Sequence, residues 1–510
     1  MSTWLNHFGV RCQRKWHRCV QECGTTRSGQ SDCGHVSGIE NMTGKKSNVV
    51  KISEHLTKKM FSEEKVNGDC IEYEKKPIAY MGDGTVIFET VRKKQKSASK
   101  KSAVGNSKKQ SAPAHQWAFK ARFRKGAFGW KSETPIKRIK EAVSEIKKVA
   151  KTSPETGAEG AVIFLERISA ALEHVDSSSG AIGSAVNKAI EELVSVIANA
   201  NVDRDVRAAW LERLWDAVQD DDIPYIETLA EHWGELCKNK DLATEWADGF
   251  EPIVQGCWGE DGDRSSGYFK GIPACLSCLY QAELFDRLFK LLEREPYKWL
   301  SHRRWGGLAL AKQGKTWESI DYIRECTDRF GGQSKLCEQI LLEAGERDEA
   351  YNLYAMAANL CNTNIATFRA IKKKYPEQDP SKILKDLVEN SPGDEGKWFA
   401  AAKDAGLFEF AIQLIEQSPC DPMTLNRACR DYRESNSHFA LSAGLASLKW
   451  LAAGYGYEIS NYDVIDVYRN TIAAATKLDS QNEIQAKLRD WWEKLPSYCF
   501  VRNSLQHTIR

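Results

Sequence analysis

The sequence predicts a mainly α-helical chain in which helix pairs repeat and stack into an α-solenoid. One observation is a recurring pattern in which an apolar helix end meets a small residue and a second apolar run follows. The small residue falls at Ala282, Gly314, Gly345 and Gly406, in steps of 32, 31 and 61 residues, with one copy unclear near Tyr375. Such a period is typical of helix-pair repeats, which cannot bury their apolar faces alone and stack on their neighbours.

A second observation is helical periodicity over most of the chain, from about residue 135 to residue 495. At its start, Ile139, Val143 and Ile146 recur every three or four residues with Lys and Arg between them. This spacing places them on one face of a helix. A run rich in Gly and Asp that begins at Gly256 predicts a joint between two helical subdomains.

The composition is that of a large chain without a membrane segment. With 510 residues, 42% hydrophobic and 28% charged, the chain can bury a large core and is expected to form about two to four units. No apolar run approaches the roughly 20 residues of a membrane helix. Arg11, Arg14, Lys15 and Arg18 occupy the place of a signal-peptide core. We therefore expect a cytoplasmic protein that does not enter a membrane.

The fifteen cysteines do not suggest a disulfide framework. Their number is odd, and those after residue 230 stand singly in predicted helices, as Cys326, Cys337 and Cys429 do. Reduced cysteines are typical of cytoplasmic proteins and behave as small apolar residues. We expect these thiols to lie reduced in the core.

The formal net charge of +2 hides a division along the chain. Residues 1–150 contain 31 Lys and Arg against 14 Asp and Glu, whereas the remainder contains 41 against 56. Between Thr90 and Ser132 there is no acidic residue, and lysines lie among Ser, Ala, Gly and Gln. Low hydrophobicity with one sign of charge cannot offset the entropy of ordering. Residues 92–115 are therefore expected to form a disordered linker.

These patterns divide the chain into six segments. Lys76–Tyr80 and Thr85–Val91 flank Gly82-Asp83-Gly84, which predicts a β-hairpin. In chain order the segments are a Cys- and His-rich region at 1–50, a small β-containing region at 51–91, a basic arm at 92–131, a helical subdomain at 132–255, helix-pair repeats at 256–495 and a tail at 496–510.

The clearest spacing of metal-ligating side chains lies in the first segment. Cys19, Cys23, Cys33 and His35 supply three thiolates and one imidazole, a set that suits a tetrahedral zinc ion. A fold of about 40 residues rarely holds a core unaided, so the metal would be needed to form it. The alternative is an N-terminal extension that binds no metal.

A second candidate site is the basic arm, where cations alternate with aromatic rings. Residues 92–131 contain 13 Lys and Arg and no carboxylate. Cations neutralise phosphates and rings stack on unpaired bases, the combination that single-strand binders use. The predicted nucleic-acid contacts are Lys93, Lys94, Lys100, Lys101, Trp117, Arg122, Phe123, Arg124, Lys125 and Trp130. The alternative is that the five rings pack against the first helix as an anchor while the cations stay in solvent. These rings are Trp117, Phe119, Phe123, Phe128 and Trp130.

Catalytic motifs are absent from the sequence. It contains no G-x-S-x-G, H-E-x-x-H or G-x-x-x-x-G-K-[ST] pattern. His174, His232, His302 and His438 lie far apart in sequence. An active site assembled from distant helices would leave no such motif, so this absence lowers the expectation of an enzyme without removing it.

Several stretches resemble an uncharacterised bacterial helical-repeat family over residues 128–480. They are Phe128–Ser132, His174–Gly183, Asp221–Ile226, Trp233–Cys237 and Gly393–Lys403. The repeat is also similar to tetratricopeptide arrays, although its periods are slightly shorter. The resemblance implies an α-solenoid and brings no known activity.

A shorter resemblance concerns the Cys- and His-rich segment. Cys33-Gly34-His35 resembles the closing C-x-H half of the SWIM zinc finger, a module linked to nucleic-acid and protein binding. The opening C-x-C half is absent, because three residues separate Cys19 from Cys23. The resemblance implies zinc as the bound cofactor.

Together these features predict a non-enzymatic cytoplasmic scaffold. An acidic α-solenoid would hold a protein partner, and the basic arm before it would contact nucleic acid. A rival interpretation makes the arm autoinhibitory, folding back on the oppositely charged solenoid and masking its partner groove. A third is an enzyme whose helical active site carries no motif.

Overall fold

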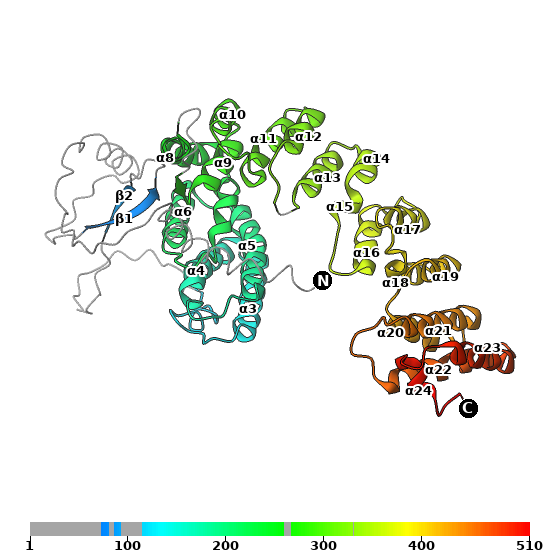
Figure 1. The fold of residues 1–510 in the computed structure, drawn as a ribbon. Coiled ribbons are helices and arrows are strands. Elements are labelled where there is room, and N and C mark those ends of the chain that lie inside the picture. The colour runs from blue at the N-terminus through cyan, green and yellow to red at the C-terminus, as the bar shows by residue number, and fades with distance from the viewer. Residues whose placement is uncertain (1–72, 81–85, 93–114, 260–266, 330, 510) are drawn as a thin grey trace, which may run out of the picture. The chain divides into compact units, whose positions relative to one another are not determined.

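The computed structural model describes residues 73–80, 86–92, 115–259, 267–329 and 331–509. The chain divides into two compact units, Met1–Thr327 and Asp328–Arg510. Both are mainly α-helical, as the sequence predicts (Figure 1). The division lies further along the chain than the joint expected at Gly256, because helices on both sides of that joint share one core. Among the described residues, no helix is long and apolar enough to span a membrane.

A short antiparallel sheet belongs to the first unit. Strand β1 (Tyr73–Tyr80) pairs with β2 (Val86–Arg92) on one edge and with β3 (Tyr268–Phe269) on the other. The register of β1 and β2 shifts between Pro77 and Ala79, next to a proline that has no N–H to donate to the ladder. The pairing confirms the predicted hairpin.

Four long helices follow in the first unit. They are α3 (Glu133–Thr152), α4 (Pro154–Ala171), α5 (Ala181–Asn199) and α6 (Arg204–Gln219). Pro154 opens α4 because the first helical position needs no N–H donor. The buried stripe of α3, which includes Ile139 and Ile146, belongs to the same core as the buried residues of α4 and α5. These three helices pack against one another (Figure 1).

Shorter helices complete the first unit around a cluster of aromatic rings. They are a 3-10 turn (Glu227–His232), α7 (Trp233–Cys237), α8 (Lys240–Trp258), α9 (Ile272–Gln281), α10 (Phe285–Glu293), α11 (Leu300–Lys312) and α12 (Thr316–Arg324). The buried rings of Trp215, Trp233 and Trp246 lie 5.3–6.2 Å apart between centroids. They fill the space between α6, α7 and α8.

The second unit is built from further helix pairs. They are α13 (Gln333–Glu343), α14 (Arg347–Ala350), a π-helical turn (Tyr351–Ala355), α15 (Met356–Ala358), α16 (Asn364–Lys374), α17 (Pro380–Glu389), a 3-10 turn (Glu395–Trp398), α18 (Phe399–Asp404), α19 (Phe408–Gln417), α20 (Pro422–Tyr432), α21 (Ser437–Ala452), α22 (Asn461–Thr476), α23 (Gln481–Lys494) and α24 (Phe500–Leu505). The segment expected as a tail contains α24, whose Val501 and Leu505 are buried in one core with residues of α21 and α22. This segment is therefore part of the fold.

The helix pairs turn at a residue with a left-handed backbone. Gly314, Gly345 and Gly406 have φ angles of 76°, 86° and 76°. After each glycine, the next N–H donates to the carbonyl five residues earlier at 2.9–3.0 Å, the Schellman arrangement that ends a helix. Glu283, with a φ of 59°, takes the same place in the first copy, and Pro376 lies in the turn of the unclear copy. The repeat in the sequence is thus a repeat of this turn.

Replacing Gly314 by alanine tests the turn. Nothing lies within contact of the added Cβ atom, so Gly314→Ala is expected to lower the free energy of unfolding by the strain of a left-handed alanine, about 1 kcal/mol. Urea unfolding followed by tryptophan fluorescence measures the change. The matched control is Gly183→Ala inside α5, where the added Cβ is equally free and φ is not positive. The free energy of unfolding of this control is expected to rise by about 0.5–1 kcal/mol. A fall equal to that of Gly314→Ala would contradict the assigned turn.

Candidate nucleic-acid interface

The segment before α3 is anchored by its aromatic rings. Trp117, Phe119, Phe123 and Phe128 are each at most 9% exposed. The ring centroids of Phe119 and Phe123 lie 5.6 Å and 5.0 Å from that of Phe164 in α4. The stacking role predicted for Trp117 and Phe123 therefore fails in this structure, because a buried ring offers no face to a base. The alternative anchoring role describes both.

The backbone of this segment is also fixed by α3 and α4. The carboxylate of Glu145 accepts hydrogen bonds from the N–H groups of Ala118 and Phe119, at 2.8 Å and 3.2 Å. Nε of Arg167 donates to the carbonyl of Phe123 at 3.0 Å. Contacts from two helices thus fix where the cations between these residues are displayed.

Trp130 is the ring of this segment that lies outside the core. It is 71% exposed, although its carbonyl accepts a hydrogen bond from the N–H of Asp176 at 2.9 Å. The backbone is held while the indole is open to solvent. Among the three aromatic residues predicted to stack on bases, Trp130 is the one whose position permits it.

The predicted cations of the described segment lie at the surface. Arg122 forms an ion pair with Glu141 at 2.9 Å, and Nζ of Lys125 lies 3.7 Å from Glu173. Arg124 is exposed and forms no ion pair within the described part of the chain. Four other predicted cations, Lys93, Lys94, Lys100 and Lys101, fall outside the described residues.

Helix α3 adds a row of lysines that the sequence-based prediction omitted. They are Lys137, Lys140, Lys147, Lys148 and Lys151, all exposed and on the side of the helix away from its buried stripe. Within the described ranges, Lys147 forms an ion pair with Glu192 at 2.8 Å and Lys137 interacts electrostatically with Glu141. The other three lysines have no carboxylate partner there. These lysines fall at helical intervals that are visible in the sequence, but such a pattern is equally typical of any solvated helix face.

The resulting surface, which we call the basic face, comprises the exposed cations of residues 120–151. Residues 117–151 contain eleven Lys and Arg against three Glu. Glu141 is already paired with Arg122 and Arg138, and its hydrogen bond from Arg138 lowers the pKa of its carboxyl. The basic face therefore suits a polyanion, because its cations would neutralise phosphates and release the counterions condensed on them.

The predicted zinc ligands, Cys19, Cys23, Cys33 and His35, fall outside the described residues. Within the ranges that are described, no group of three or more His, Cys, Asp or Glu side chains could hold a metal ion. Zinc binding stays a prediction for the Cys- and His-rich segment.

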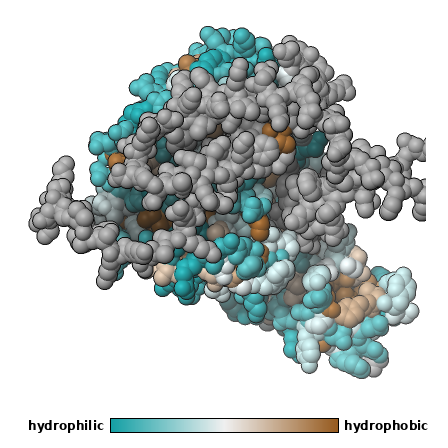
Figure 2. Space-filling model, turned by 90° about the vertical axis from the view of Figure 1, so that its left-hand side faces the viewer, coloured by the Kyte–Doolittle hydropathy of each residue, from teal (hydrophilic) through white to brown (hydrophobic). Residues whose placement is uncertain are grey.

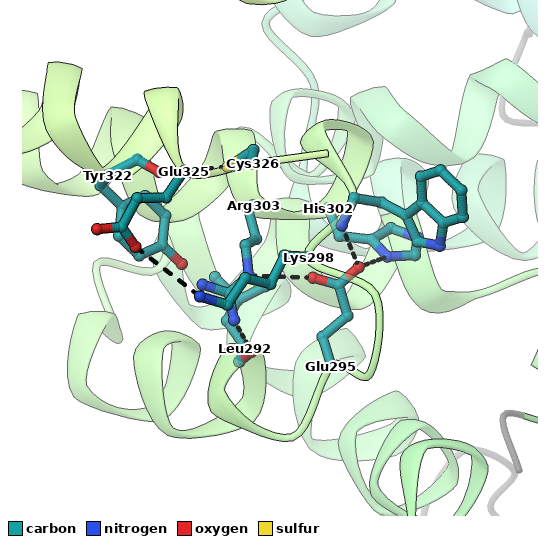
Figure 3. Close-up of polar contacts among 9 residues, drawn as sticks. Leu292, Glu295, Lys298, His302, Arg303, Tyr322, Glu325 and Cys326 are labelled. Atoms are coloured by element: carbon teal, nitrogen blue, oxygen red, sulfur yellow. Dashed lines mark hydrogen bonds and ion pairs between the residues drawn. The ribbon is translucent and has the colours of Figure 1, made fainter. Parts of the chain in front are cut away.

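A buried polar cluster before α11 contains residue types that catalysis often uses (Figure 3). Oε1 of Glu295, a residue that is 4% exposed, accepts a hydrogen bond from the N–H of Trp299 at 2.8 Å. Nδ1 of His302 lies 2.8 Å from the same oxygen, and Nε of Arg303 donates to Oε2 at 3.3 Å. A second guanidinium nitrogen of Arg303 donates to the carbonyl of Leu292 at 3.0 Å.

The geometry gives this cluster a structural role. Both oxygens of Glu295 are occupied by groups of its own chain, and burial raises the pKa of the nearby Cys326 thiol to about 11, which disfavours a nucleophilic thiolate. The N–H of Thr327 donates to the carbonyl of Lys298 at 2.8 Å, and the N–H of Leu300 donates to the carbonyl of Thr327 at 3.1 Å. The cluster and these bonds join the start of α11 to the segment that follows α12.

The structure confirms the buried thiols that the sequence predicts. Cys326, Cys337 and Cys429 are buried thiols, and burial raises the pKa of the Cys429 thiol to about 12. Among the described cysteines, Cys361 is the exposed one.

Alkylation of the native protein tests this distribution of thiols. Iodoacetamide is expected to label Cys361 well before Cys429, because the reaction needs an accessible thiolate. Peptide mapping by mass spectrometry after brief treatment measures the labelling of each residue. The same treatment in urea supplies the control, since all thiols are then accessible. Comparable labelling of the two residues in the native protein would contradict the assigned burial.

Glu295→Gln tests the polar cluster. The substitution leaves the buried guanidinium of Arg303 without its counter-charge, so the free energy of unfolding is expected to fall by about 3 kcal/mol. Chemical unfolding followed by tryptophan fluorescence measures it. Glu325→Gln is the matched control, because the Glu325 side chain is 71% exposed and lies 3.8 Å from Lys298, an ion pair worth under about 1 kcal/mol. The structural role is wrong if both variants are equally stable.

No protein-family model matches this chain, and a search of curated proteins finds no relative. The resemblances to a bacterial helical-repeat family and to half of a SWIM finger therefore stay expectations from the sequence.

Proposed function

We propose that this chain is a cytoplasmic scaffold that binds nucleic acid through the basic face and a protein partner through its helix-pair repeats. The thiols buried in both units suit a reducing compartment, where they would remain free. Stacked helix pairs offer extended surfaces of the kind that repeat proteins use to hold partners.

The observation that carries the nucleic-acid part is the row of lysines on α3. Lys140, Lys148 and Lys151 have no carboxylate partner within the described ranges. Residues 137–151 extend over roughly 20 Å of helix axis, a length over which several phosphates of one strand can be reached. Unpaired ammonium groups break no existing ion pair when a phosphate binds, so counterion release favours association.

Trp130 favours a strand with unpaired bases. Its exposed indole lies one residue from Lys131, and both belong to a segment whose backbone is held by α4 and the turn after it. Single-strand binders combine such a ring, on which any base can stack, with cations that follow the backbone. In a duplex the bases are stacked on each other and offer no free face.

Paired lysine substitutions test the basic face. A labelled single-stranded oligonucleotide is titrated with the full-length protein at several salt concentrations, and its fluorescence anisotropy is measured. Lys140→Gln with Lys148→Gln is expected to weaken binding and to make the fall of log affinity with log salt less steep by about 1.4. Each phosphate that the protein no longer neutralises reduces the size of this negative slope by about 0.7. Trp130→Ala is expected to weaken binding of the single strand without changing that slope.

A control of equal charge separates a site from a general attraction. Lys372→Gln with Lys373→Gln removes the same two charges from exposed positions of α16 in the second unit and is expected to leave affinity and slope unchanged. Equal reductions of affinity in both pairs would mean that net charge alone drives binding. Absence of binding even at low salt would refute the nucleic-acid part, and a gain in protein-partner binding on removal of residues 1–114 would then support the autoinhibitory arm.

A further inference from the structure

Exposed aromatic rings gather in the last part of the second unit. The five residues are Tyr455 (47% exposed), Tyr457 (84%), Tyr462 (85%), Tyr498 (87%) and Phe500 (45%). We call this surface the tyrosine patch. Rings of this size are usually buried where the fold can bury them, and a surface that leaves five of them in solvent is typical of an interaction site.

Contacts between distant segments bring these rings to one end of the unit. Sγ of Cys499, next to Tyr498 and Phe500, donates to the carbonyl of Ala452 at the end of α21, 3.9 Å away. Oγ of Ser504 in α24 donates to Oδ1 of Asn461 at the start of α22, at 2.8 Å. The end of α21 therefore meets the start of α24, and the end of α24 meets the start of α22. In the lower part of Figure 2, which contains α20–α24, pale and brown residues lie at the surface among teal ones.

The loop that carries Tyr455 and Tyr457 is held in place. The N–H of Tyr455 donates to the carbonyl of Trp450 at 3.0 Å, and the two rings pack edge to face with centroids 5.5 Å apart. Gly454 and Gly456 supply the positive φ angles of the loop, 86° and 113°. A capping box between Ser460 and Asp463 fixes the start of α22. A loop whose backbone is already positioned loses little conformational entropy when its rings are covered.

The two segments that carry the tyrosine patch contain few charged residues. Glu458 is the one charged residue between Ala452 and Tyr462, and residues 495–501 contain none. A nucleic acid or a strongly charged peptide would find no counter-charge in these two segments. A second surface of the same kind meets no repulsion, and each tyrosine hydroxyl can both donate and accept a hydrogen bond, so the patch is complementary to itself.

We infer that two copies of this chain associate through their tyrosine patches in a two-fold symmetric contact. The exposed parts of the five rings amount to about 700 Å², taking roughly 200 Å² for each ring. A stable interface takes about 800 Å² from each partner, so these rings with their immediate neighbours supply the required area. In a two-fold contact the same surface serves both partners. The inference is independent of the basic face, which belongs to the other unit.

Sedimentation velocity of the full-length protein over a concentration series tests the inference. The wild-type chain is expected to shift from monomer to dimer as concentration rises. Tyr457→Ser combined with Tyr498→Ser is expected to raise the dimer dissociation constant by at least about tenfold, since central aromatic residues dominate such interfaces. Both rings are exposed, so thermal unfolding is expected to show an unchanged fold.

Trp317→Ser provides the control. Trp317 lies in α12 of the first unit and is 46% exposed, so the substitution removes a large exposed ring outside the patch and is expected to leave the dissociation constant unchanged. A wild-type chain that stays monomeric at every concentration overturns the inference and leaves the patch to a different protein. A dimer whose dissociation constant does not respond to the double substitution overturns it as well.

Discussion

The constraint on which this protein depends is that one helix pair cannot bury its own apolar face. Each pair has to be covered by the next, and the chain meets this need by repeating one turn with a left-handed residue between two helices. The turn returns the chain so that the second helix packs on the first. Stability then comes from contacts between neighbouring helices. Each helix pair leaves an apolar face that the following pair covers.

Buried carboxylates help to hold neighbouring helices together in both units. Glu295 accepts hydrogen bonds from groups around the start of α11 and forms an ion pair with Arg303. In the second unit, Glu338 is fully buried and accepts from Tyr375, Asn359 and Lys374 at 2.6–2.8 Å. A carboxylate whose acceptor positions are filled by its own chain holds helices together and is poorly placed for acid–base chemistry.

Two surfaces stand out among the side chains that packing leaves exposed. The basic face uses the solvent side of α3, whose other side is required for the core, and so it offers cations without weakening the fold. The tyrosine patch uses loops and helix ends in the second unit, where rings can be displayed on a fixed backbone. One surface suits phosphates and the other suits a neutral partner, so a scaffold could hold both at once.

The sequence by itself determined what short-range physics controls. The spacing of Gly314 and Gly345, the turn signal before Thr85 and the period of α3 each reflect backbone geometry over a few residues, and they predicted the repeat, the hairpin and the helical class. Only the tertiary structure decided which rings between Trp117 and Trp130 are buried, because that depends on Phe164 and other residues distant in sequence. For the same reason the sequence could not place α24 in the core or bring Tyr457 and Tyr498 to one end of a unit: long-range packing selects among surfaces that look alike in the sequence.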